Sequence, residues 1–346
     1  MNGLYALYKA FTNRLGGAKQ DFLPAAPVDA VPAGAPIVPT APPPRAPLSD
    51  ALPFLTTTID NHFYPWLVDL TVFSDPPLTE FEAGALDSLK QTVTGQTFNT
   101  QMVPRLPAVI PQLMHSLKDE KISGARLAQQ IAKDPALVGE VIRLANSPFY
   151  RRSRKIASIE QAVILVGQNG LRQLIARVAF YPILNLRSGS MTRLAGARLW
   201  AQSERCALIC RCLAEKAQVD SFAAYLSGLV SNVGMIVGLH LMDQLLNTRQ
   251  DGIPASSAFY EVFIAHSEKF SCRIVEEWGF PENVILAIHE KAEHGVDDAT
   301  SELGKLLSQA DQYSKISVME EHRRLPEEID INAMKRIPCF AQTALS

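Results

Sequence analysis

Three histidines in the C-terminal half of this 346-residue sequence come closest to the spacing of a metal site: His266, His289 and His294. His289 is followed by Glu290 and, five residues after the first histidine, by His294. In the zinc motif HExxH the second histidine follows the first by four residues, so that both side chains lie on one face of a helix. A step of five residues turns the second histidine away from that face. The stretch therefore does not predict a zinc site.

The cysteines offer little metal or redox chemistry. There are five, an odd number, and no pair has the CxxC spacing of a structural zinc site. Cys206 and Cys210 lie four residues apart in an apolar helical stretch, which is typical of side chains that pack in a core. We therefore expect no disulfide framework and a reducing, cytoplasmic setting.

Positive charge is concentrated in one part of the chain. Residues 143–198 contain ten Arg or Lys residues and one acid, whereas residues 251–346 contain seventeen acids and nine bases. Guanidinium clusters suit an acidic protein surface, a nucleotide messenger or an RNA backbone. The alternative is that the acidic half of the chain neutralises this stretch. The candidate binding surface consists of Arg143, Arg151, Arg152, Arg154 and Lys155.

Neither composition nor motif predicts a DNA-binding protein. The formal net charge of -2 excludes a globally basic nucleic-acid coat. Residues 127–142 have the pattern of a helix-turn-helix, but Ala136, Leu137, Val138 and Gly139 offer almost no hydrogen bonds to base edges, and Glu140 repels phosphate. We expect no sequence-specific DNA binding.

The elements that position these residues fall into five segments. Residues 1–20 predict an amphipathic helix and residues 21–49 a disordered Pro/Ala-rich linker. Residues 50–100 form a small docking segment, with a capped helix over residues 79–89. Residues 101–300 are a helical domain, and residues 301–346 a helical extension. The fold class is therefore all-α.

Local signals place the boundaries of some of these helices. Asp134-Pro135 and the Ser158–Gln161 capping box each start a helix, and Asn169-Gly170 marks a turn. Residues 221–242 contain no charge and could be mistaken for a membrane span. Their many small and polar residues favour a buried helix with a break near Gly234, and we expect no transmembrane segment.

Two stretches resemble a known family. The first, within residues 106–167, reads LPAVIPQL, LAQQIAKDPALVGEVIRLANSPFY and IASIEQAVILVG; the second includes Leu199-Trp200, Gly228-Leu229, Gly234 and the later W-G-F-P at residues 278–281. Over about residues 101–300 they resemble the HDOD family, the HD-related output domains of bacterial signalling proteins. The resemblance implies a multi-helix bundle similar to that of the HD-domain phosphohydrolases.

The resemblance also implies where metal ligands would lie. The first His of the HD pattern falls on Gln202, the His-Asp pair on Ser231-Asn232, and the distal Asp on Asp311. Three of these four positions are neutral, and neutral side chains do not offset the charge of a hard divalent cation. We therefore expect a degenerate site with no cofactor and no catalysis.

The family pattern further places His266 and His289 near the former metal cleft. They are interpreted either as a residual ligand or anion pocket or as hydrogen-bonded histidines that fix helix packing.

The resulting expectation is a cytoplasmic, non-catalytic signalling output or scaffold protein. Its partners would be proteins of a signalling pathway, with a nucleotide second messenger as a possible ligand. Two alternatives remain open. One is a residual metal-dependent phosphohydrolase that uses His266, His289 and Asp311. The other is a nucleotide- or nucleic-acid-binding regulator that uses the basic stretch 143–198.

Overall fold

The computed structural model describes residues 52–70, 75, 77–94, 132, 135–147, 156–184, 189–247, 254–294 and 300–341. Every regular element in these ranges is a helix, which confirms the all-α fold class. The predicted helix 1–20 and linker 21–49 lie outside the described residues. The helices are α2 (Leu52–Leu67), α3 (Glu80–Thr94), α6 (Pro135–Ala145), α7 (Ile159–Leu184), α8 (Ser190–Ala217), α9 (Ser221–Val230), α10 (Val233–Asn247), α11 (Ser257–Glu277), α12 (Glu282–His294), α13 (Glu302–Glu321), α14 (Ile331–Lys335) and α15 (Pro338–Ala341).

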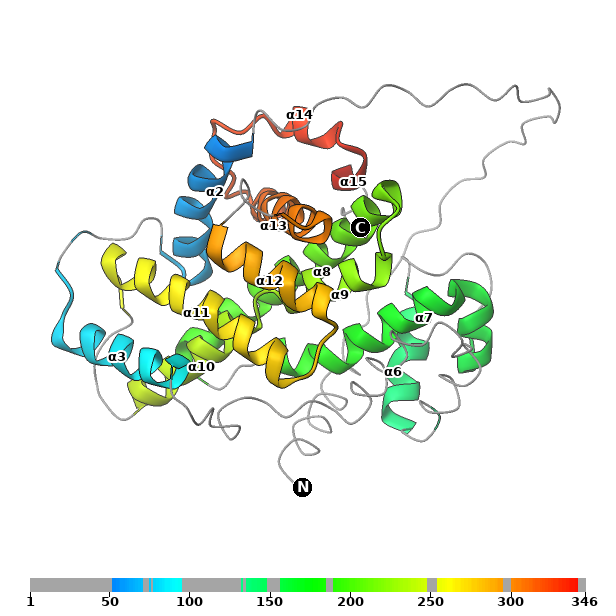
Figure 1. The fold of residues 1–346 in the computed structure, drawn as a ribbon, viewed down its shortest axis with the longest axis horizontal. Helices are drawn as coiled ribbons and strands as arrows, with labels where there is room; N and C mark the ends of the chain where they lie inside the picture. Colours follow the sequence, from blue (N-terminus) through cyan, green and yellow to red (C-terminus); the bar gives the residue numbers. More distant parts are fainter. Residues whose placement is uncertain are drawn as a thin grey trace, which may run out of the picture. The chain divides into compact units, whose positions relative to one another are not determined.

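Helix α8 is the centre of the core. It packs against α9, α13 and α10, and most of its side chains are buried, including the polar residues Gln202, Glu204 and Arg205. Figure 1 shows α13 between α2, α12 and α8, with α6 and the first part of α7 forming a separate pair of helices. Because α8 is enclosed, polar groups on it must find partners inside the protein.

The uncharged residues 221–242, which were predicted to form a buried helix with a break, form two helices. Helix α9 ends at Val230 and α10 begins at Val233, so the break lies at Ser231-Asn232, just before Gly234. Residues 221–246 are long and apolar enough to cross a membrane, but 94% of their most apolar window is buried within the protein. This burial is what a core helix of a folded domain requires.

Helix α7 contains a break, and the sequence analysis had predicted a turn slightly later in the chain. Gly167 has φ 71° and ψ 179°, outside the helical region, and separates two helical segments. A non-glycine residue adopts positive φ only with strain, so this glycine permits the change of direction. The predicted turn at Asn169-Gly170 is wrong by two residues, because those residues already belong to the second helical segment.

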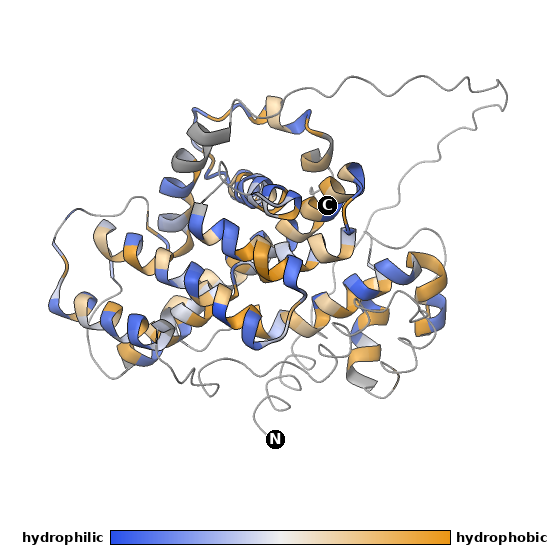
Figure 2. Cartoon of the chain, in the orientation of Figure 1, coloured by the Kyte–Doolittle hydropathy of each residue, from blue (hydrophilic) through white to orange (hydrophobic). Residues whose placement is uncertain are grey.

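Helices α2 and α3 pack on the rest of the described chain. Helix α3 contacts α11 and α10, and α2 contacts α13 and α8. The predicted cap of α3 is confirmed: the Thr79 amide donates to Glu82 Oε2 at 2.9 Å, and the Glu82 amide donates to Thr79 Oγ1 at 3.1 Å. Hydrophilic and hydrophobic residues are mixed along α3, α11 and α12 in Figure 2, as expected for helices with one buried face.

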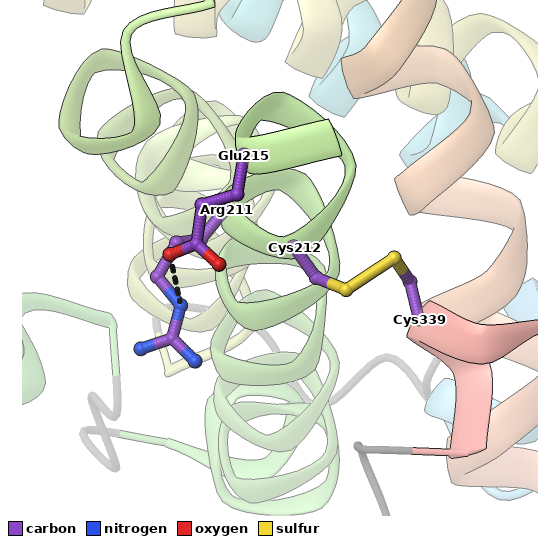
Figure 3. The surroundings of a disulfide bond; sticks show 4 residues. All are labelled: Arg211, Cys212, Glu215 and Cys339. Atoms are coloured by element: carbon purple, nitrogen blue, oxygen red, sulfur yellow. Dashed lines mark ion pairs between the residues drawn. A yellow bond between two sulfur atoms is a disulfide. The ribbon is translucent and has the colours of Figure 1, made fainter. Parts of the chain in front are cut away.

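The C-terminal end is attached to α8 by a disulfide. Cys212 of α8 and Cys339 of α15 are bonded, with their Cα atoms 5.6 Å apart and a sequence separation of 127 (Figure 3). The expectation of a fully reduced protein is therefore wrong for this pair, because residues so distant in sequence give no local signal of pairing. Cys206, Cys210 and Cys272 are buried free thiols, and packing was the predicted role of the first two.

The disulfide can be tested by counting thiols. We expect the purified, denatured protein to react with three equivalents of a thiol reagent before reduction and with five after it, since two of the five cysteines are bonded. The control is Cys339→Ser, which should give four equivalents under both conditions. Five equivalents in protein purified without reductant would contradict the pairing.

Candidate functional site

Three of the four residues at the expected HD positions lie together. Asn232 Nδ2 donates to Gln202 Oε1, and Gln202 Nε2 donates to Asp311 Oδ1 at 3.0 Å and to Ser314 Oγ at 2.8 Å. Ser231 differs, since its hydroxyl donates to the Gly228 carbonyl oxygen of its own helix at 3.2 Å. A continuous hydrogen-bonded chain thus joins α8, the α9–α10 break and α13.

The local fold explains how these residues meet. Gln202 is on the buried α8, and Asp311 is on α13, which packs along α8. Asn232 lies in the break between α9 and α10, where its side chain is half-buried and turned toward Gln202. Because a buried amide must satisfy both its oxygen and its nitrogen, Gln202 links the other two residues rather than pointing to solvent.

Two lysines complete the site. Lys315 is one turn after Asp311 on α13, and its ammonium lies 2.7 Å from Asp311 Oδ2 and 2.7 Å from Asp60 Oδ1 of α2. Lys291 of α12 lies 3.2 Å from Glu268 Oε1 of α11. Both lysines are buried, which is rare for lysine unless it is paired. We call the following residues the Asp311 cluster: Gln202, Asn232, Lys291, Asp311 and Lys315.

The electrostatics keep these groups ionised. Burial on its own would lower the pKa of Lys315, but the carboxylates of Asp311 and Asp60 outweigh it and hold that pKa well above its ordinary value. Burial would likewise lower the pKa of Lys291, but Asp311 and Glu268, with a smaller effect of Tyr64, together raise it above its ordinary value. Burial raises the pKa of Asp311, but the two ammonium groups outweigh it and lower that pKa.

The Asp311 cluster does not fit a divalent cation. Both carboxylate oxygens of Asp311 are engaged, one by an amide and one by an ammonium. A metal bound there would face the charges of Lys315 and Lys291 and would have to displace the first of them. In the described ranges, no three His, Cys, Asp or Glu side chains are grouped so that they could hold a metal ion.

The two candidate cleft histidines lie elsewhere. His289 Nε2 is 2.8 Å from Glu276 Oε1, and the pair is partly exposed. His266 is on α11; burial and the nearby Lys269 and Lys90 lower its pKa. Among the described contacts, neither histidine reaches Gln202, Asn232 or Asp311. The combination of His266, His289 and Asp311 required by the hydrolase alternative is therefore not assembled.

The basic stretch is partly neutralised within the fold. Arg151, Arg152, Arg154 and Lys155 lie outside the described residues. Arg143 is exposed and pairs with Glu140 on its own helix at 2.8 Å. Other arginines of the stretch bond to groups of the protein: Arg172 to Asn169, Arg177 to Glu204, and Arg198 to Asp69 and to the carbonyl oxygens of Trp66 and Leu67. The positive charges of Arg172, Arg177 and Arg198 are therefore engaged within the protein and are not free at its surface.

Lys291, Lys315 and Asp60 were missed by the sequence analysis. The i,i+4 spacing of Asp311 and Lys315 on one helix was an available signal of pairing. It did not show that the pair is buried, because charged residues on a helix are usually exposed. The contact with Asp60 spans 255 residues, so no local pattern could reveal it.

The described helices thus enclose a buried cluster of hydrogen-bonded polar residues from α8, α13 and the break between α9 and α10. Residues 103–294 match the HDOD domain, and the chain belongs to that family. A solved HDOD domain protein of unknown function from Geobacter sulfurreducens is 19% identical, with a TM-score of 0.54 over 75% of this chain and 88% of that one. A Shewanella amazonensis structure with the provisional name metal-dependent phosphohydrolase is 17% identical, with a TM-score of 0.54 over 77% of this chain and 91% of that one.

Curated relatives match over part of their length. An uncharacterized protein of Treponema pallidum is 23% identical over 214 residues, which is 60% of this chain and 40% of the relative. The uncharacterized YuxH of Bacillus subtilis is 24% identical over 207 residues, 58% of this chain and 44% of the relative. The chain thus spans less than half the length of the curated relatives it matches. The solved structures show the fold alone, and the family match assigns residues 103–294 to the HDOD domain.

Proposed function

We propose that this protein is a non-catalytic output or scaffold component of a bacterial signalling pathway that acts in the cytoplasm by binding protein partners. The observation that supports this proposal is the Asp311 cluster. Where hydrolytic chemistry needs several anionic or imidazole ligands around a cation, this chain has two amides and one carboxylate that is already paired with lysine. Such a cluster stabilises helix packing and offers no activated water.

The recognition surface in this proposal is the basic segment of the sequence that contains Arg151, Arg152, Arg154 and Lys155, together with Arg143. Arg143 has an exposed side chain near the end of α6 that precedes this segment in sequence. Guanidinium groups bind carboxylates in a bidentate way, so an acidic protein surface is the favoured partner. A nucleotide messenger would use the same chemistry.

The proposal is tested by metal analysis together with turnover assays. We expect the purified 346-residue chain to contain less than one equivalent of metal. We also expect no hydrolysis of phosphodiesters, nucleotides or cyclic dinucleotides above the buffer rate when Mn²⁺ or Fe²⁺ is added, because Lys315 occupies the Asp311 carboxylate. The matched control is Asp311→Asn, which removes the one anionic residue at the HD positions.

Stoichiometric metal, with turnover that Asp311→Asn abolishes, would overturn the proposal in favour of a phosphohydrolase. Turnover that survives Asp311→Asn would indicate a contaminating enzyme or a different site. The first result contradicts the proposal, whereas the second is resolved by repeating the assay after a further purification step.

A further inference from the structure

The position of a cation beside Asp311 is filled by the protein itself. Asp311 Oδ1 accepts from Gln202, and Asp311 Oδ2 lies 2.7 Å from the Lys315 ammonium. Lys291 adds a second positive charge close enough to Asp311 to shift its pKa. An ammonium group carries positive charge as a metal ion does, but it donates hydrogen bonds to acceptor oxygens instead of coordinating them. The site therefore suits acceptors such as carboxylate and hydroxyl oxygens.

Helix α2 provides those oxygens. The Lys315 ammonium lies 2.7 Å from Asp60 Oδ1 and 3.4 Å from the Tyr64 hydroxyl, one turn further along α2. It also lies 5.6 Å from the ring centroid of Phe63 and 4.9 Å from that of Tyr64, within cation–π range. The side chain of Asp60 is 31% exposed and that of Lys315 only 3%, so α2 lies on the solvent side of the lysine.

A second polar contact holds the C-terminal end of α2. Arg198 of α8 donates to the carbonyl oxygens of Trp66 and Leu67, and it pairs with Asp69 at 3.0 Å. Its guanidinium carbon lies 4.8 Å from the Trp66 ring centroid. Carbonyl groups at the end of a helix have no partner within the helix, so a cation there satisfies them. The middle and the C-terminal end of α2 are thus anchored by charge.

Helix α2 lies outside residues 103–294, which match the HDOD domain, as does α13, which carries Asp311 and Lys315. A small apolar pocket lies at the contact of α2 with α10 and α11, lined on the α2 side by Tyr64, Leu67 and Val68. Ile59, Phe63 and Leu67 are buried, so apolar packing and the polar contacts attach α2 together.

We propose that the Asp311 cluster is a binding site for a helix that presents a carboxylate and a hydroxyl one turn apart, and that α2 is its occupant within the chain. In this site the lysine ammonium replaces the metal ion as the positive charge. Release of α2 would uncover Lys315 together with the apolar surface that Phe63 and Trp66 now cover. This inference does not depend on whether the protein is catalytic.

Hydrogen exchange of the full-length protein tests the proposal. In Asp60→Asn the amide cannot replace the carboxylate as an ion-pair partner, and we expect α2 amides to exchange about tenfold faster. Amides of α8 and α9 should exchange at the wild-type rate, because Asp311 still neutralises Lys315. The matched control is Asp87→Asn, the same change at an exposed position of α3. Asp60→Glu keeps the charge, so the α2 amides of this variant should retain much of the wild-type protection from exchange.

Two results would overturn the proposal. If α2 remains as protected in Asp60→Asn as in the wild type, the carboxylate does not hold the helix. If α2, α8 and α9 all exchange faster together, α2 is an inseparable part of the core and not an occupant of a site. Loss of metal binding or activity would have no bearing on either result.

Discussion

Lys315→Met is expected to lower the free energy of unfolding by about 3–5 kcal/mol, the range found when one partner of a buried ion pair is removed. Methionine is about as long as lysine and fills similar space, so the loss comes from the charge and not from a cavity. Without the ammonium, Asp60 and one oxygen of the buried Asp311 lose their partner. Chemical denaturation of the full-length protein, with the slope of the transition compared between variants, measures the effect.

The matched control is Lys305→Met on the same helix. Lys305 pairs with Glu302 at 3.4 Å, but both side chains are more than half exposed, so we expect a change below about 1 kcal/mol. The double variant Lys315→Met with Asp311→Asn removes both charges and should recover part of the lost stability. A Lys315→Met variant as stable as Lys305→Met would show that the pair contributes nothing.

The effect of Lys315→Met should be constant between about pH 5 and pH 9. The pKa of Lys315 is raised, so its contribution is complete below the unfolded-state value of about 10.4 and is lost as pH rises through the folded-state value. The pKa of Asp311 is lowered, so its contribution is complete above the unfolded-state value of about 3.9 and is lost as pH falls further. A steep change of the difference near neutral pH would contradict this assignment.

The comparison of sequence and structure separates local from distant information. Helical periodicity and the Ser158–Gln161 capping box predicted elements correctly, because each depends on residues within a few positions. The break before α10 was also predicted from small and polar residues in an apolar stretch. The pairing of Cys212 with Cys339 was not, since it is a property of tertiary packing.

The candidate site divides in the same way. The family resemblance predicted Gln202, Ser231, Asn232 and Asp311 as a group. The side chains of Gln202, Asn232 and Asp311 are hydrogen-bonded to one another, whereas that of Ser231 bonds to the Gly228 carbonyl oxygen. It did not predict what fills the site, because a lysine on a helix is usually exposed to solvent. For the same reason a sequence alone could not show that Arg177 and Arg198 face acids and carbonyl groups of the protein instead of a partner.

Gly234→Ala is expected to lower the free energy of unfolding by about 3 kcal/mol or more, at the upper end of the range for overpacking. A Cβ atom at this position would lie within 3.0 Å of the Ser267 carbonyl oxygen, the Ser271 amide nitrogen and Ser271 Oγ. Two of these are backbone atoms of α11 and cannot rotate away. The Gly234 amide also donates to Ser271 Oγ at 2.9 Å, so α10 and α11 would have to separate. Thermal and chemical denaturation would measure the loss.

The matched control should change stability in the opposite direction. Gly139 is inside α6, and a Cβ atom there would meet nothing within 4 Å, so Gly139→Ala should stabilise the protein by about 0.5–1 kcal/mol through helix propensity. Similar effects of the two substitutions would rule out close helix contact as the reason for Gly234. Because Asn232 lies two residues before Gly234, separation of α10 from α11 should also weaken its hydrogen bond to Gln202. Gly234→Ala should therefore loosen the Asp311 cluster, which Gly139→Ala should leave intact.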